Sequence, residues 1–237
     1  MGEGKAEAVI WARTPKPARG PQPAYSLDQI ADAAIRIADA EGLEALTMRR
    51  LATEIGAGAM SLYRYVSGKT DILDLMADRV LGEIELKPYE DWRSGLLWLA
   101  RATREHMHRH PWLAIMPRSA TPLGPHGLYL TEHAMGIMDD LGLNIDEMMA
   151  SVGLVNIYVH GTVQQELATA ERLRQAGVTM EEWMRMNAPY ILGLVESKKH
   201  PMLERIIIDA QWPHLGPDQA FEYGLERVLN GIAATVG

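Results

Sequence analysis

The sequence has no cysteine and only one phenylalanine among its 237 residues. Without thiols, neither a disulfide framework nor a thiolate metal site can form. Its longest apolar run, Met148 to Val163, contains Asn156 and His160, and it is too short and too polar to span a bilayer. The N-terminus also lacks the apolar segment of a secretory signal, so we expect a cytoplasmic protein with no membrane partner.

Signatures of catalysis are missing as well. The sequence contains no H-E-x-x-H, no G-x-S-x-G, no P-loop and no dinucleotide-binding fingerprint. The glycines of Gly56-Ala57-Gly58 are too few to cradle a phosphate, and no pair of carboxylates is singled out as acid and base. We therefore expect a protein that is not an enzyme and that has no cofactor.

What the chain does have is apolar residues, at 47%, among them 14 methionines, while six tryptophans and eight tyrosines offset the scarce phenylalanine. This content is ample for a packed core, so disorder is not expected. Methionine-rich interiors repack easily and suit an adaptable ligand pocket. Methionine is equally an ordinary core residue, and composition alone leaves both interpretations open.

The net charge of −8 is unevenly distributed. Residues 1–70 hold nine Lys and Arg against eight Asp and Glu, a balance of +1, whereas residues 71–237 hold 14 against 23, a balance of −9. Residues 47–69 alone carry four basic residues and one acidic residue. Salt screens charges beyond about 8–10 Å, so a local basic surface can attract phosphates despite the acidic remainder.

Residues 26 to 66 have the pattern of three short helices. Ser26 and Gln29 form a capping box for the first helix, and Thr47 is a good cap for the second. After a glycine-rich turn, a third helix over roughly residues 59–66 buries two apolar residues one turn apart, Leu62 and Val66. Its other face is polar, basic and aromatic, which is typical of a helix that enters a DNA groove.

The segment LTMRRLATEIGAGAMSLYRYVSGKTDIL closely resembles the DNA-binding signature of the tetracycline-repressor (TetR) family of bacterial regulators. The match runs from about Ser26 to Met76, and HPWL at 110–113 and FEYGLERVLNGI at 221–232 match more loosely. The resemblance implies an all-helical homodimeric repressor with a small DNA-binding domain and a larger domain for a small molecule that releases it. Met60 replaces a common proline and Tyr65 a common histidine, so the operator sequence cannot be inherited from relatives.

The resemblance also implies contacts with the DNA backbone. The matching positions are Thr47, Tyr63 and Lys69. Packing of Tyr63 against the first helix, and a merely solvated charge at Lys69, are the alternatives.

We expect base contacts from the surface that faces the DNA groove, which we call the reading face; it comprises the start of the second helix and the outward side of the third. We predict that Arg49 forms a bidentate contact with guanine, with a phosphate contact or a solvated surface arginine as the alternative. The other candidates on this face are Met60, Ser61, Arg64 and Tyr65.

We divide the chain into an arm (1–24), a helix-turn-helix domain (25–70) and a ligand-binding and dimerisation domain (71–237). The arm is rich in proline and is expected to be flexible. It has three basic residues with no acid near them, Arg13, Lys16 and Arg19. We predict that they enter the adjacent minor groove, and the alternative is an inert leader.

The sequence predicts that the larger domain is also helical. No segment alternates with a period of two long enough to indicate a strand, which predicts an all-α fold. Pro189 should kink its helix or mark a restart. The predicted helices are Thr70–Leu86, Asp91–His108, Gly127–Leu141, Asp146–Arg174, Thr179–Ser197, Pro201–Ala210 and Pro217–Ala234.

The helix over 146–174 is apolar almost all round, which predicts burial on more than one side. Asn156, His160 and Gln164 form one polar stripe along it, at intervals of four residues. Buried polar groups need partners, so the stripe either lines the ligand cavity or forms a hydrogen-bonded seam at an interface. Further candidates for the walls of a ligand cavity, with ordinary core packing as the alternative, are Trp98, Trp112, Met116, Tyr129, His133, Met135, Trp183 and Met184.

His106 and His110 have the spacing of paired metal ligands on a helix. However, Pro111 stops the helix there, and no nearby carboxylate or cysteine completes a site. Histidines at a helix C-terminus are also favourable through the helix dipole. The sequence therefore predicts no metal site.

Together these patterns predict a repressor that binds a pseudo-palindromic DNA operator as a homodimer and is released by a small-molecule effector. Two alternatives are a ligand-independent DNA-binding protein and a helical small-molecule enzyme with a vestigial DNA motif. About 160 residues beyond the DNA motif exceed what dimerisation alone requires, which counts against the first. The missing catalytic signatures count against the second.

Overall fold

The structure, a computed structural model, describes residues 8–13, 25–116, 123–209 and 216–236. Within these ranges every regular element is helical, which confirms the all-α prediction. A 3-10 turn, η1, covers Ile10–Ala12. The α-helices are α1 (Leu27–Glu41), α2 (Met48–Glu54), α3 (Ala59–Leu62), α4 (Lys69–Leu81), α5 (Trp92–Arg109), α6 (Trp112–Ile115), α7 (Pro125–Ile137), α8 (Ile145–Ala176), α9 (Met180–Glu196), α10 (Pro201–Asp209) and α11 (Pro217–Ala233).

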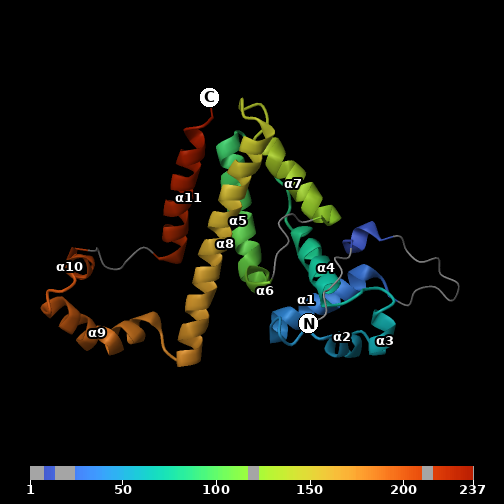
Figure 1. Ribbon diagram of the computed structural model, residues 1–237, viewed down its shortest axis with the longest axis horizontal. Coiled ribbons are helices and arrows are strands. Elements are labelled where there is room, and N and C mark those ends of the chain that lie inside the picture. Colours follow the sequence, from blue (N-terminus) through green and yellow to red (C-terminus); the bar gives the residue numbers. More distant parts are fainter. Residues whose placement is uncertain (1–7, 14–24, 117–122, 210–215, 237) are drawn as a thin grey trace.

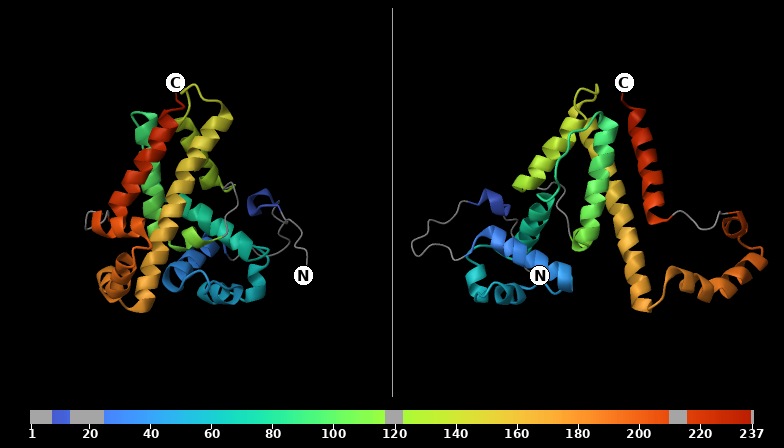
Figure 2. Two further views of the ribbon diagram at one scale, coloured as in Figure 1. Left: turned by 60° about the vertical axis from the view of Figure 1, so that its left-hand side comes forward. Right: turned by 180° about the vertical axis from the view of Figure 1, so that it is seen from behind.

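The helices form a small group and a larger body (Figure 1). Helices α1, α2 and α3 gather at one end, and α4 leads from them toward α7. In the body, α8 packs against both α5 and α11, and α9 and α10 extend from its C-terminal end (Figure 2). No described helix is both long enough and apolar enough to cross a lipid bilayer.

Helix ends follow local capping chemistry. The Ser26–Gln29 capping box is present, and reciprocal boxes also start α5, α8 and α9. Gly177 ends α8 in the left-handed region, with φ 65° and ψ 28°. A side-chain N-cap contributes about 1 kcal/mol, so these ends are specified by a few neighbouring residues. Helix α9 continues through Pro189 without a restart.

Helix α4 differs from the sequence prediction at both ends. It begins after Gly68 rather than at a Thr70 cap, and it ends at Leu81 rather than Leu86. The N-cap residue Gly68 offers no side-chain cap, and the carboxylate of Asp71, within the first turn, reaches back to accept the backbone N–H of Ser67 at 2.6 Å. Helix α3 is also shorter than predicted, because turns follow Leu62.

Two hydrophobic cores organise the chain. The first joins α1 to α4 and includes Ile37, Leu51, Leu62 and Met76. The second lies among α5, α7, α8 and α11, where Phe221 is 1% exposed. The apolar face of α4 belongs to this first core, so α4 packs with α1, α2 and α3 although the predicted boundary lies at residue 70.

Part of the predicted arm packs onto this first core. Ile10 is 7% exposed, and Arg13 donates to both carboxylate oxygens of Asp71, at 2.5 and 2.8 Å. The Asp71 side chain is only 4% exposed, so this ion pair compensates a buried charge. Residues 8–13 therefore differ from the flexible arm expected from the sequence.

The N-terminus of α7 rests on a second carboxylate of α4. The buried side chain of Asp78 accepts the Gly127 N–H at 2.9 Å and lies 3.0 Å from His126 Nδ1. A negative charge at a helix N-terminus is favourable because the first N–H groups have no partner within the helix. This approach needs a glycine, since a Cβ on Gly124 would lie 2.1 Å from Asp78 Oδ1.

Replacement of Gly124 should test this contact. We expect Gly124→Ala to lower the free energy of unfolding by about 1–3 kcal/mol, because the new methyl group collides with Asp78. Gly193→Ala is the matched control, since its Cβ meets nothing within 4 Å inside α9. It should stabilise the protein by up to about 1 kcal/mol. Urea unfolding at one protein concentration measures both, and equal stabilities would contradict the predicted contact.

Candidate nucleic-acid interface

Helices α2 and α3 and the turn between them have the geometry predicted for a helix-turn-helix. Thr47 caps α2 by accepting the Arg50 N–H at 3.1 Å. Gly56 has φ +70°, a conformation that favours glycine, and it turns the chain toward α3. Leu62 and Val66 are buried as predicted, which directs the opposite side of α3 outward.

Several predicted DNA-binding side chains are exposed on this unit. Met60 is 79% exposed and Tyr63 50% exposed, while Ser61 is half-buried. Arg49 and Arg64 are exposed, and no hydrogen bond or ion pair with another described residue holds their guanidinium groups. Exposed arginines without a partner among the described residues can contact phosphates or base edges directly.

Arg50 has a different environment from its neighbour Arg49. Its guanidinium donates to Glu41 at 2.7 Å and to Glu54 at 2.9 Å, which ties α2 to the end of α1. These hydrogen bonds, the one to Glu41 foremost, raise the pKa of Arg50, and the Arg50 guanidinium lowers the pKa of Glu54. The basic count of residues 47–69 therefore overstates the charge available to DNA by one.

Lys69 and Thr47 flank the reading face. Lys69 is exposed at the start of α4, and its Nζ donates to the Leu43 carbonyl at 3.2 Å. It lies beside the loop that leads into α2. Thr47 is exposed at the start of that helix. Both positions are compatible with phosphate contacts, which remain predictions.

Tyr65 contributes to packing as well as to the surface. Its ring is half-buried and meets Tyr25 edge to face, with centroids 6.4 Å apart. The Tyr25 hydroxyl donates to the Gly56 carbonyl at 3.3 Å, so the pair braces the turn. Tyr65 thus packs against Tyr25, just before α1, whereas Tyr63 is half-exposed; base recognition by Tyr65 remains a prediction.

The predicted basic arm is only partly described. Arg13 is held by Asp71, and it also donates to Ser67 at 2.7 Å. A minor-groove contact by Arg13 would have to break this pair. Lys16 and Arg19 lie outside the described residues.

The structure does not gather the predicted ligand-binding residues into one place. Trp112 and Met116 belong to the first core. His133 instead lies in the body, edge to face with Tyr89 and Trp98 at 5.7 and 6.2 Å. Its buried Nε2 has no hydrogen-bond partner among the described residues.

The polar stripe of α8 faces more than one environment. Asn156 is exposed and His160 is half-buried. The Gln164 side chain donates to the Ala114 carbonyl at 2.5 Å, which links α8 to α6. On α9, Trp183 lies beneath the Arg172 guanidinium, 5.6 Å from the ring centroid. Their role in ligand binding remains a prediction.

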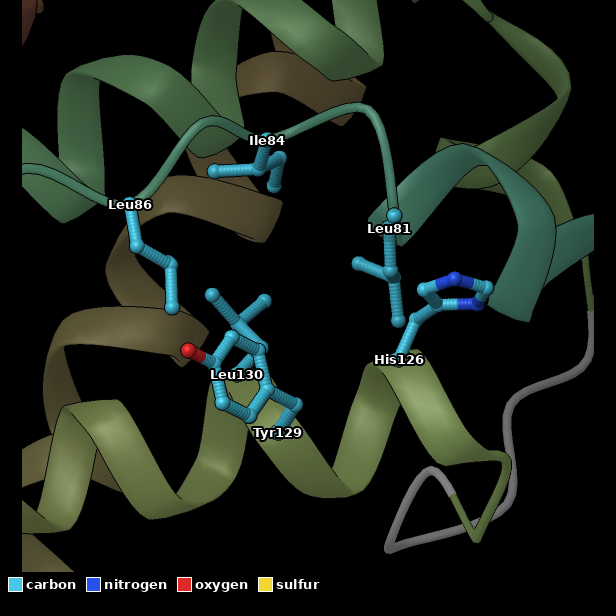
Figure 3. Close-up of a pocket in the computed structure, with 7 residues that line it drawn as sticks. Leu81, Ile84, Leu86, His126, Tyr129 and Leu130 are labelled. Atoms are coloured by element: carbon cyan, nitrogen blue, oxygen red, sulfur yellow. The ribbon is translucent and has the colours of Figure 1, made fainter.

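A hollow of about 330 Å³ lies where α4 meets α7 (Figure 3). Of the predicted ligand-binding residues, Tyr129 lines it and the others do not. No periodicity marked this place in the sequence, because its wall includes the irregular segment after α4. The lining residues are Leu81, Gly82, Ile84, Leu86, His126, Tyr129 and Leu130.

An exposed helix-turn-helix face attached to a larger helical body defines the class of helix-turn-helix DNA-binding proteins. Comparison with known proteins narrows the class. Residues 30–76 match the bacterial regulatory proteins of the tetR family, and residues 84–236 match the tetracyclin repressor-like C-terminal domain. The chain belongs to the TetR family. It is a transcriptional regulator with a DNA-binding N-terminal unit and a ligand-binding C-terminal domain.

Individual relatives agree over nearly the whole chain. The HTH-type transcriptional repressor DrrR1 of Streptomyces coeruleorubidus is 37% identical over 233 residues, which cover 96% of this chain and 84% of DrrR1. An HTH-type transcriptional regulator of Saccharopolyspora erythraea is 34% identical, with coverages of 98% and 94%. The crystal structure of Streptomyces coelicolor ActR in complex with actinorhodin is 30% identical, with a TM-score of 0.74 and coverages of 90% and 98%.

The contrast between the exposed cations of the interface predicts two kinds of DNA-binding defect. Arg49→Ala should cost about 1–3 kcal/mol at one base pair and relax preference there, because a bidentate base contact is lost. Lys69→Ala should weaken binding on all sequences alike and lower the salt slope by about one unit. Fluorescence anisotropy on a panel of operator variants at several salt concentrations separates the two.

Arg50→Ala is the matched control, because Arg50 is held by Glu41 and Glu54. It should leave sequence preference unchanged in the folded protein. Uniform loss of affinity for Arg49→Ala would identify Arg49 as a phosphate anchor instead.

Proposed function

We propose that this protein is a cytoplasmic repressor that binds a pseudo-palindromic operator as a homodimer, has no catalytic activity, and leaves DNA when a small molecule binds its body. The unpaired arginines on the outward face of the helix-turn-helix carry the DNA-binding part of the proposal. The relatives named above are transcriptional regulators, which supports a role other than catalysis.

A two-fold symmetric dimer is expected because the DNA-binding surface of one chain is small. One short recognition helix contacts only a few base pairs, and a dimer reads two half-sites at a fixed spacing. The outward face of α8 offers an apolar surface for a second copy. Ile157 is 73% exposed and Leu154 46%, although the opposite face of α8 is buried by Val155 and Val159. The sequence predicted that α8 is buried on more than one side, and a second copy would complete this burial.

Helix α11 packs beside α8. Its own apolar stripe, which includes Leu225 and Leu229, is used within the chain against α8 and α5. Two copies of α8 and α11 would then form a four-helix interface.

A charge on the outward face of α8 should therefore separate the subunits. We expect Ile157→Glu to convert the dimer to a monomer at micromolar concentration, because it places a carboxylate in an apolar contact. Leu128→Glu, at a 49% exposed position on α7, should remain dimeric. Analytical ultracentrifugation measures both. A monomeric wild-type protein would refute the homodimer.

Helix α4 connects the DNA-binding unit to α7, which gives an effector a route to the reading face. The α4 helix belongs to the DNA-binding core, yet its Asp78 carries the N-terminus of α7, and its end lines the hollow beside α7. A ligand that shifts α7 therefore acts on the helix that positions the reading face. Such coupling requires the ligand to favour one of two conformations, and typical values change the operator affinity about 5- to 150-fold.

Two places compete for the effector, and substitution can distinguish them. The polar stripe of α8 predicts that replacing Asn156 and Gln164 by Leu abolishes the response and keeps DNA affinity within a few-fold. If the effector instead binds in the hollow beside α7, Tyr129→Ala and Leu130→Trp should abolish the response and keep DNA affinity within a few-fold. The operator is first identified from genomic fragments that the protein binds. Release of the protein from this operator is then measured by fluorescence anisotropy. Actinorhodin is the first probe, because ActR binds it.

Response lost only in the stripe variants places the effector on α8, and response lost only in the hollow variants places it beside α7. Structurally diverse compounds follow as probes if actinorhodin leaves the complex intact. A compound that raises the melting temperature of the protein is taken to bind it. If the operator stays fully occupied in the presence of every such compound, effector control is refuted.

A further inference from the structure

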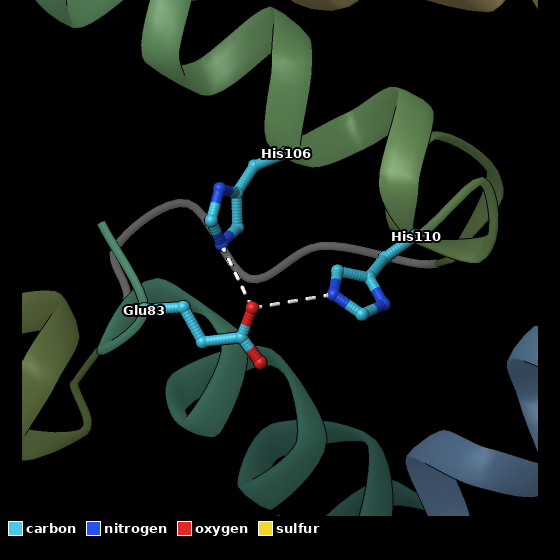
Figure 4. A group of neighbouring side chains, drawn as sticks. All are labelled: Glu83, His106 and His110. Atoms are coloured by element: carbon cyan, nitrogen blue, oxygen red, sulfur yellow. Dashed lines mark ion pairs between the residues drawn. The ribbon is translucent and has the colours of Figure 1, made fainter. Parts of the chain in front are cut away.

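A cluster of three potential metal ligands lies where the segment after α4 meets the C-terminal end of α5 (Figure 4). Glu83 follows α4, and His106 and His110 are one turn apart at the end of α5. Glu83 Oε2 lies 3.3 Å from His106 Nε2 and 3.5 Å from His110 Nε2. The histidines are 6% and 5% exposed, and both Nε2 atoms are buried without a hydrogen-bond partner among the described residues.

The surroundings fix the proton on one of these rings. Nδ1 of His110 lies 2.9 and 3.1 Å from the two carboxylate oxygens of Asp39, so it carries the N–H and donates. Asp39 also accepts from Trp112 Nε1 at 2.7 Å. In the neutral ring, His110 Nε2 then presents a lone pair to Glu83. A lone pair facing a carboxylate is unfavourable unless a cation lies between them.

That cation is either a proton or a metal ion. The neutral imidazole is the form that binds metals, and both rings are buried away from water. Arg109 lies 3.6 Å from Glu83, but its exposed side chain also pairs with Glu105 at 3.1 Å and can turn away.

We propose that Glu83, His106 and His110 form a binding site for a divalent transition-metal ion of the zinc type, with a fourth position open to water. Tetrahedral zinc with bonds of about 2.0–2.2 Å separates its ligand atoms by roughly 3.3–3.5 Å, which fits the two distances to Glu83. Two nitrogens and one oxygen suit zinc better than magnesium or calcium, which prefer all-oxygen sites.

The groups behind the ligands also fit this assignment. Metal-bound histidines usually donate their second N–H to a carboxylate or carbonyl, which fixes ring orientation. Asp39 supplies such a carboxylate to His110, and the His106 ring interacts with the Val80 backbone. The ion would join the end of α4 to α5 and, through Asp39, to α1. The inference rests on none of the DNA-binding or effector residues.

The test uses untagged, full-length protein treated with chelator. Isothermal titration calorimetry with Zn²⁺ should show one site per chain, and Co²⁺ should give the intense visible absorption of a tetrahedral complex. Glu83→Gln and His106→Gln should each weaken Zn²⁺ binding at least about tenfold, and Asp39→Asn about 10- to 100-fold. Glu85→Gln, an exposed carboxylate two residues away, and His200→Ala, an exposed histidine, are the controls and should bind as wild type does.

Far-UV circular dichroism shows which variants remain folded. The Glu83 side chain is 42% exposed, so Glu83→Gln should fold and decides the outcome even if a histidine variant does not. Absence of saturable Zn²⁺ binding to wild type would overturn the proposal. So would wild-type affinity in folded Glu83→Gln, or an equal loss in Glu85→Gln. These measurements need no operator or effector, so they are independent of the proposed repressor function.

Discussion

The carboxylate of Asp39 links the DNA-binding helices to the larger helical body. It lies on α1 and accepts hydrogen bonds from Trp112 and His110, which follow α5. Trp112 is 2% exposed within the core of α1 and α4. Hydrogen bonds to a charged group contribute about 1.5–3 kcal/mol each, and burial of the indole adds to them. The position of the reading face relative to the body depends on this junction.

Ion pairing explains how an acidic protein keeps a basic reading face. In the body, arginines of α5 bridge helices: Arg104 pairs with Glu166 of α8 and Asp218 of α11, and Arg101 with Glu222 of α11. On the DNA-binding unit, Arg49 and Arg64 have no such partner among the described residues. Exposed pairs add little stability, but a paired guanidinium is no longer available to a phosphate. The distribution of partners therefore selects which cations can meet DNA.

Local features could be predicted from the sequence, and contacts between distant segments could not. The caps at Ser26, Thr47 and Gly177 depend on residues within one turn, so composition and spacing identify them. The helix-turn-helix is similarly local. By contrast, the sequence shows the His106–His110 spacing but not the approach of Glu83, because only the path of the chain after α4 brings that carboxylate near. The place of Trp112 in the first core could not be predicted either, because apolar character does not say which core a residue joins.

The way α4 is held also limits how a signal can reach the DNA. One face of α4 is buried against α1, where Met76 and Val80 are fully covered, so close packing prevents α4 from sliding alone. A displacement of α7, passed on through Asp78, would then move α1 to α4 together rather than α4 alone. Such a movement leaves the helix-turn-helix intact and changes its distance from the same unit in a second copy. Since two half-sites are separated by a fixed length of DNA, altered spacing alone suffices to release both.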